Sequence, residues 1–262
     1  MPQLYTLNVI QMTAVFLIGS AIVYTLGALF FNVYTDNIQL EHNNDLAGVK
    51  LGFFEPLVSV AMVFSISLAW LQYNALVGEI QRETTILTVL AASARTLPEP
   101  GRSALTSRIV GYAEAVAGPE WKAMAEGQAS EAVSDALRTL TRTYATTRAA
   151  TPRERSILRY SAGQLVALAQ SRESRVEAAR FHLGSAMFSL LIIGTGISIL
   201  MSWFFGLPTM LTKLVMGILF TWSMMLVVIY VYALLHPFTG PVGVSNENYL
   251  DIARSLIQSS DQ

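Results

Sequence analysis

The sequence predicts an all-α membrane protein with four transmembrane helices and a helical cytosolic domain inserted between the second and third spans. Composition places the chain in the membrane class: 53% of its 262 residues are hydrophobic, and its mean hydropathy is +0.46. Only 13% are charged, against about 25% in an ordinary soluble domain. The third observation is the spacing of long uncharged segments, which sets the order of the elements below.

Residues 12–31 are uncharged, and their length is enough to cross a bilayer as a helix. Residues 32–50 are polar and are predicted to form a loop. His42 lies in this loop beside Glu41 and Asp45, but a metal site needs three or more well-placed ligands. We therefore expect a solvated acidic loop and no metal ion.

Residues 51–71 form the second predicted span, and no strong helix breaker separates them from residues 72–92. As one helix, residues 51–92 would be about 60 Å long, roughly twice the thickness of a hydrocarbon core. Glu55 stands before Pro56 near the start of this span. It is either a helix cap in the first turn or an ionisable residue at a water-filled mouth, and both interpretations stay open.

One face of the same segment carries the residues that would line any pathway along it. Helical spacing of three or four residues brings them together. These pore-lining candidates are Glu55, Ser59, Met62, Ile66, Ala69 and Tyr73.

Residues 72–182 are predicted to form the cytosolic helical domain. Breaks are expected at 97–101 and 118–121, with helices over 102–117 and 130–144. A long returning helix is expected to start at Thr151, because Thr151, Pro152 and Glu154 match the pattern of a capping box. The many carboxylates of this domain, Glu83 and Glu120 among them, balance its arginines, and this predicts a solvated surface with no affinity for nucleic acid.

Residues 183–205 and 214–235 are the third and fourth predicted spans, and residues 236–262 form a tail. All but three of the 17 Lys and Arg residues lie in 78–182; the exceptions are Lys50, Lys213 and Arg254. By the positive-inside rule, the helical domain and both termini are expected in the cytoplasm, with loops 32–50 and 206–213 outside.

No pattern of reactive residues points to an enzyme. The chain has no cysteine, its three histidines are far apart in sequence, and it has no phosphate-binding loop or nucleophile elbow. We therefore expect neither catalytic residues nor a cofactor.

Two short motifs carry a resemblance to a known family. The first runs from Tyr112 to Val116 and ends in Glu120 and Trp121; the second combines Pro237 and Phe238 with Gly240 and Pro241. With the segment around Trp70 that leaves the second span, these motifs make residues 52–255 similar to the bestrophin-like family of bacterial membrane proteins.

The resemblance implies a homo-oligomeric channel in the bacterial inner membrane, with four spans per subunit and a pore lined by the second span. Its partners would be the lipid bilayer, copies of itself and small inorganic ions, with anions favoured. Two features depart from bestrophins: no acidic cluster follows the fourth span, and Phe53, Phe54 and Phe64 are not evenly spaced down one face. The alternative is a non-conducting membrane scaffold or sensor whose helical domain binds a partner through the region 104–144.

Overall fold

The structure is a computed structural model, and it describes residues 9–34, 44–180, 185–207, 209–238 and 242–260. Within these ranges every regular element is a helix. The chain divides into two compact units, each described here by itself. The apolar unit comprises residues 1–71, 182–236 and 240–242, and the second unit comprises residues 72–181, 237–239 and 243–262.

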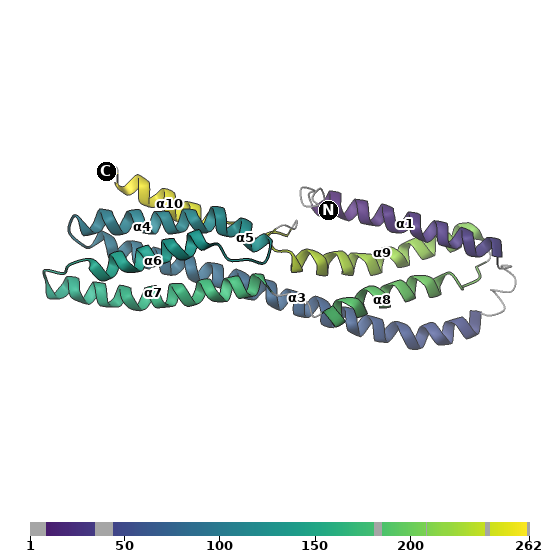
Figure 1. Cartoon of the computed structure of the whole chain (residues 1–262). Coiled ribbons are helices and arrows are strands. Elements are labelled where there is room, and N and C mark those ends of the chain that lie inside the picture. Colours follow the sequence, from purple (N-terminus) through teal and green to yellow (C-terminus); the bar gives the residue numbers. More distant parts are fainter. Residues whose placement is uncertain (1–8, 35–43, 181–184, 208, 239–241, 261–262) are drawn as a thin grey trace. The chain divides into compact units, whose positions relative to one another are not determined.

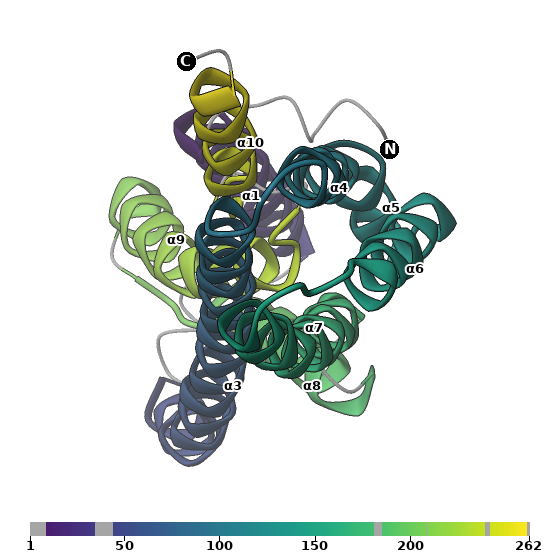
Figure 2. The same cartoon turned by 90° about the vertical axis from the view of Figure 1, so that its left-hand side faces the viewer.

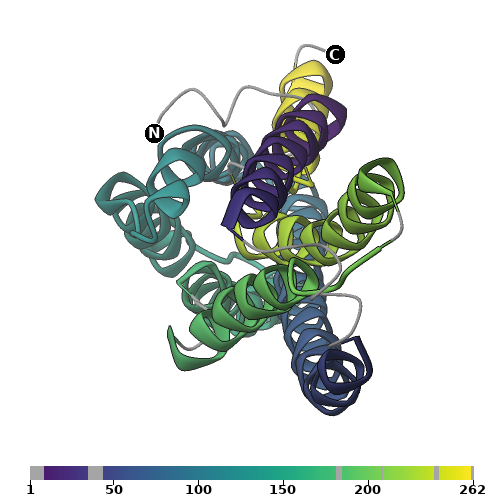
Figure 3. The same cartoon turned by 90° about the vertical axis from the view of Figure 1, so that its right-hand side faces the viewer.

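Among its described residues, the apolar unit contains four helices. They are α1 (Val9–Tyr34), the first part of α3 (Asn44–Arg95), α8 (Ser185–Ser202) and α9 (Met210–Leu235). They neighbour one another in the order α1, α9, α8 and α3 (Figures 1 and 3). By length and composition, α1, α3 and α9 are able to cross a membrane, whereas the apolar stretch of α8 is shorter. The 18 residues of α8 extend about 27 Å, slightly less than a hydrocarbon core.

Small residues allow these helices to approach one another closely. A Cβ atom on Gly217 of α9 would overlap the ring of Tyr24 on α1, and one on Gly27 would overlap the indole of Trp203. A Cβ atom on Gly194 of α8 would lie 3.3 Å from Val58 of α3. Close contact at small residues is how apolar helices associate in lipid, where the hydrophobic effect does not drive them together.

The loop predicted over residues 32–50 is wrong at its end, because α3 already begins at Asn44. The side-chain amide of Asn44 makes two hydrogen bonds with the backbone of Gly206. Asn44 Nδ2 donates to the Gly206 carbonyl at 2.7 Å, and the Gly206 N–H donates to Asn44 Oδ1 at 2.9 Å. This contact holds the start of α3 beside the segment between α8 and α9. The predicted acidic loop around His42 lies outside the described residues.

Two further residues, Pro56 and Lys213, lie at other places in their helices than the sequence predicted. Pro56 lies inside α3 and not in a first turn, so the helix lacks one backbone hydrogen bond at this point. Lys213 was expected in a loop before the fourth span. It lies within α9, close to the N-cap Thr209, and it is buried.

In its described part, the second unit is built from the last part of α3 and further helices: α4 (Gly101–Ala115), the π-helix η2 (Val116–Glu120), α5 (Trp121–Ala125), α6 (Glu131–Thr146), α7 (Pro152–Ala179) and α10 (Glu247–Ser260). Figure 2 looks along this unit and shows α10 beside α4, and α6 between α4 and α7. Its core includes Leu87, Leu105, Ile109, Leu140 and Leu168, all fully buried.

The predicted start of the returning helix is confirmed. The Glu154 backbone N–H donates to the Thr151 hydroxyl at 3.2 Å, and the Glu154 carboxylate accepts from the Thr151 N–H, which completes the capping box. The break predicted over 118–121 is wrong, since the chain stays helical there as η2 and α5. The wider π turn accommodates Pro119, which has no N–H to donate.

Candidate functional site

The six pore-lining candidates do not share one exposed surface. Met62 and Ala69 are buried inside the chain, at 6% and 0% exposure, whereas Ser59 is exposed. Glu55, Ile66 and Tyr73 are half-buried. A different face of α3 is exposed and apolar; it carries Phe53, Leu57, Val60, Phe64 and Leu71.

Glu55 is the ionisable residue of this region, and its setting separates its two interpretations. It lies well inside α3, so the prediction that it caps the helix is wrong. Its Oε1 atom is buried and has no hydrogen-bond partner. Leaving a carboxyl oxygen unsatisfied is unfavourable, and an ionisable group in a membrane segment generally serves an ion or water pathway. The interpretation of Glu55 as an ionisable residue at a water-filled mouth stays a prediction.

The second unit contains a buried charge cluster formed by Glu83, Glu120, Arg172 and Arg175. The side chains of Glu83, Glu120 and Arg175 are fully buried, and that of Arg172 is 13% exposed. The elements α3, η2 and α7 supply these residues. Two carboxylates face two guanidinium groups, so the formal charge of the cluster is zero.

Arg175 joins the two carboxylates. Its Nε donates to Glu83 Oε2 at 2.6 Å, and its Nη2 donates to Glu83 Oε1 at 3.3 Å and to Glu120 Oε1 at 3.0 Å. Arg172 binds Glu120 with two parallel hydrogen bonds of 2.9 Å each. Bidentate contacts of this kind are the strongest that arginine makes with a carboxylate.

Neutral groups complete the cluster. The Tyr112 hydroxyl donates to Glu83 Oε1 at 2.7 Å, and the Ser130 backbone N–H donates to Glu120 Oε2 at 3.2 Å. On a neighbouring turn of α7, the Ser171 hydroxyl donates to the Glu79 carboxylate at 2.8 Å. These bonds join α4 and α7 to α3, and the segment before α6 to η2, within the second unit.

Burial and the negative carboxylates keep the phenols of this region protonated. Burial raises the pKa of Tyr112 well above its ordinary value, and the charge of Glu83 raises it further. The pKa of Tyr249 on α10 is raised by the same two causes. Burial alone would lower the pKa of Arg175, but the adjacent Glu83 carboxylate more than offsets this and holds it above its ordinary value. Tyr112 and Tyr249 therefore stay neutral, and Arg175 stays charged, throughout the physiological pH range.

The described residues of the two family motifs meet at this cluster. Glu120 is one of its carboxylates, and the ring of the adjacent Trp121 lies 5.3 Å from that of Phe238 and 6.1 Å from that of Tyr249. The Arg175 guanidinium lies 5.9 Å from the centre of the Tyr249 ring. Pro237 accepts a hydrogen bond of 2.8 Å from Val244, while Gly240 and Pro241 lie outside the described residues.

The prediction of a solvated surface is wrong at Glu83 and Glu120, since both are buried. A local signal existed, since Glu83 continues the face formed by Ile80, Leu87 and Leu90, all of which are buried. On the buried face of α7, Arg175 lies one turn after Ser171 and two turns after Leu168. A charged residue in register with a buried apolar stripe predicts a buried ion pair, but not which residue completes it.

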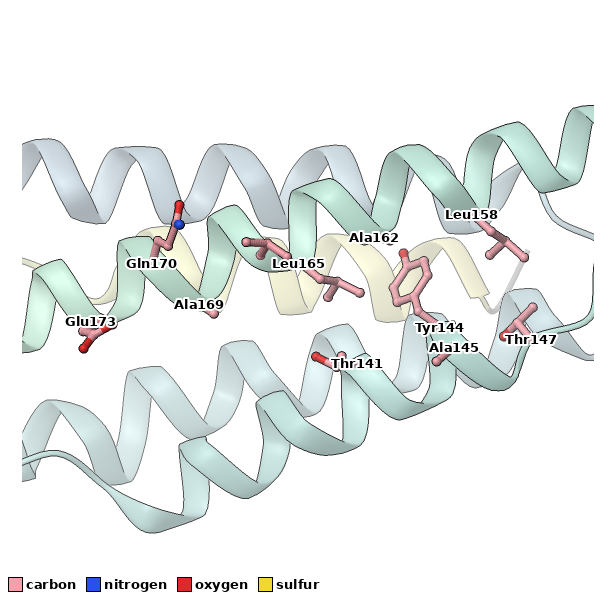
Figure 4. A pocket seen from close by; sticks show the side chains of 11 residues that line it. Thr141, Tyr144, Ala145, Thr147, Leu158, Ala162, Leu165, Ala169, Gln170 and Glu173 are labelled. Carbon is pink, nitrogen blue, oxygen red and sulfur yellow. The ribbon is translucent and has the colours of Figure 1, made fainter.

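A groove of about 650 Å³ runs between α6 and α7. Figure 4 shows Tyr144 of α6 pointing toward Leu165 and Ala162 of α7. The Tyr144 hydroxyl donates to the Leu90 carbonyl of α3 at 2.9 Å, and burial raises its pKa. The groove is mostly apolar, with Gln170 and Glu173 among its polar side chains.

Comparison with known proteins gives one family and one fold. Residues 15–249 match the profile of the bestrophin-like domain. The structure resembles the crystal structure of a mutant bacterial bestrophin homologue from Klebsiella pneumoniae, with a TM-score of 0.74 at 12% identity, over 94% of this chain and 99% of that one. No curated protein sequence matches this chain.

Proposed function

The chain belongs to the bestrophin-like family, and from this membership we propose that it forms a homo-oligomeric ion channel whose pore is lined by α3. Each copy contributes one such helix around a common axis in the bilayer. In this proposal α1, α3, α8 and α9 are the four spans of a bacterial inner-membrane protein, and both termini and the second unit lie on the cytoplasmic side. Of the 17 Lys and Arg residues, 14 lie in residues 78–182, and the exceptions are Lys50, Lys213 and Arg254. This distribution supports the orientation, because positively charged segments tend to stay in the cytoplasm.

The observation that carries the proposal is α3 itself. It is one continuous helix of 52 residues, and its apolar part is long enough to cross a membrane. That part combines an exposed apolar face with Glu55, whose carboxyl oxygen lacks a donor. Around an axis, such a helix provides an apolar wall with an ionisable group along it. Ser59, Ile66 and Tyr73 remain candidates for that wall. Met62 and Ala69 are buried within the subunit and would instead contribute to the packing of the helix there.

The preferred ion follows from two opposing arguments. The family resemblance favours anions. A ring of Glu55 carboxylates at the mouth of the pore favours cations, because rings of acidic side chains attract them. We propose that Glu55 sets the balance between the two.

Replacing Glu55 with glutamine is expected to reduce the permeability of cations relative to anions, because it removes a negative charge from each copy and preserves the shape of the side chain. The measurement is the reversal potential of reconstituted protein across a salt gradient. Asp45→Asn is the matched control: Asp45 is an exposed carboxylate in the first turn of the same helix, and its loss should leave the reversal potential nearly unchanged. Equal selectivity in Glu55→Gln and the parent would remove Glu55 from the pathway.

The proposal as a whole is tested by ion flux into liposomes that contain the purified protein. Oligomeric, correctly inserted protein should conduct small ions. The same preparation without flux would contradict the channel. The scaffold or sensor would then be the better function, with the groove between α6 and α7 as its binding surface.

A further inference from the structure

Lys213 of α9 is a buried cation without a counter-charge. Lys213 is 1% exposed, and its Nζ atom has no hydrogen-bond partner. Among the described residues, the other buried charged side chains are Glu83, Glu120 and Arg175, and each has an opposite charge within hydrogen-bond distance. An unpaired buried ammonium is strongly unfavourable, so a partner for Lys213 is expected.

Among the described residues, no acceptor lies within hydrogen-bond distance of this ammonium. Tyr24 of α1 lies beside it: the Tyr24 hydroxyl donates to the Lys213 backbone carbonyl at 3.5 Å, and its ring covers Gly217 one turn further along α9. The ring of Trp203, which follows α8, lies 6.4 Å from that of Tyr24. The Trp203 Nε1–H is also buried without a partner. Tyr24 thus neighbours two residues, Lys213 and Trp203, that each carry a buried N–H donor without a partner.

We propose that Lys213 holds a small inorganic anion of the halide class among α1, α8 and α9. The missing group must accept hydrogen bonds, since both orphaned atoms are donors, and it must be negative to balance the ammonium. It must also be small, because a residue that is 1% exposed offers no opening to a bulky ligand. Lys213 belongs to α9 and Trp203 follows α8, and neither belongs to α3, so this anion is bound within the fold and is distinct from any ion that passes along α3.

The test is the thermal stability of detergent-purified full-length protein in sodium bromide against sodium gluconate at equal ionic strength. Bromide should raise the Tm of the wild type by roughly 5 °C and the effect should saturate, as expected for a ligand that binds only the folded state. Lys213→Met should abolish this rise. In gluconate its Tm should at least equal that of the wild type, because methionine fills similar space without a charge. Lys50→Met, which changes an exposed lysine of the same unit, should keep the full rise.

Two results would overturn the inference: no bromide effect on the wild type, or the same effect on Lys213→Met. A rise caused by phosphatidylglycerol in gluconate, present in the wild type and lost in Lys213→Met, would assign the site to a lipid phosphate and overturn the halide. Should Lys213→Met not fold, bromide-soaked crystals of the wild type decide the question by an anomalous peak beside Nζ or its absence. None of these measurements requires conduction, so their failure is distinguishable from failure of the channel proposal.

Discussion

Replacing Arg175 with methionine is expected to lower the free energy of unfolding by about 3–5 kcal/mol, the range found when one partner of a buried ion pair is removed. The change leaves the Glu83 carboxylate buried with only the Tyr112 hydroxyl as a donor. Glu120 loses one contact but keeps Arg172 and the Ser130 N–H. The uncompensated charge of Glu83 is therefore the main cause of the loss. Thermal unfolding of the purified protein, followed by circular dichroism, measures it.

Two further variants make this prediction specific. Glu83→Gln in the Arg175→Met background removes the orphaned charge and should restore much of the stability, which a double-mutant cycle quantifies. Arg102→Met breaks an exposed pair with Glu99, in which both side chains are about half exposed, and should change stability little. A loss in Arg175→Met no greater than in Arg102→Met would show that the cluster does not hold the second unit together.

Replacing Gly217 with alanine is expected to lower the free energy of unfolding by about 1–3 kcal/mol, the usual effect of overpacking. The added methyl group would overlap the Tyr24 ring, so α1 and α9 would have to move apart. Loss of this close contact removes the packing that holds helices together in lipid. The measurement is the thermal midpoint of the protein in detergent.

Gly196→Ala is the matched control for this change. Gly196 also lies within an apolar helix, α8, but a Cβ atom added there would meet nothing within 4 Å. Alanine is a better helix former than glycine, so this variant should be neutral or slightly more stable. Equal destabilisation by both substitutions would attribute the effect of Gly217→Ala to the helix backbone and not to the contact with Tyr24.

Local patterns predicted the parts of the fold that depend on neighbouring residues. The capping box at Thr151 is found as expected, and α4 covers most of the helix predicted over residues 102–117. Both depend on a spacing of three or four residues within one helix. The start of α3 was misplaced because its first turns are polar, and the contact of Asn44 with Gly206 joins positions 162 residues apart.

The sites themselves depend on such distant contacts, which sequence patterns do not reveal. Glu83 and Arg175 are 92 residues apart, and each alone looks like an ordinary surface charge. Lys213 and Tyr24, whose hydroxyl donates to the Lys213 carbonyl, are 189 residues apart and belong to different helices. The sequence singled out α3 and Glu55, because an acidic residue in an apolar segment is visible in one dimension. Which face of α3 is exposed depends on α8, whose Gly194 packs against Val58.

The most direct test of the central claim, that α3 lines an ion pathway, is a single-channel recording of a cysteine variant. The chain has no cysteine, so Ser59→Cys introduces a unique thiol at an exposed position of α3, and Ser223→Cys does the same on α9. A charged, water-soluble thiol reagent is predicted to change the current of Ser59→Cys and to leave that of Ser223→Cys unaltered. An unchanged current after complete modification of Ser59→Cys, or oligomers that carry no current at all, would contradict the claim.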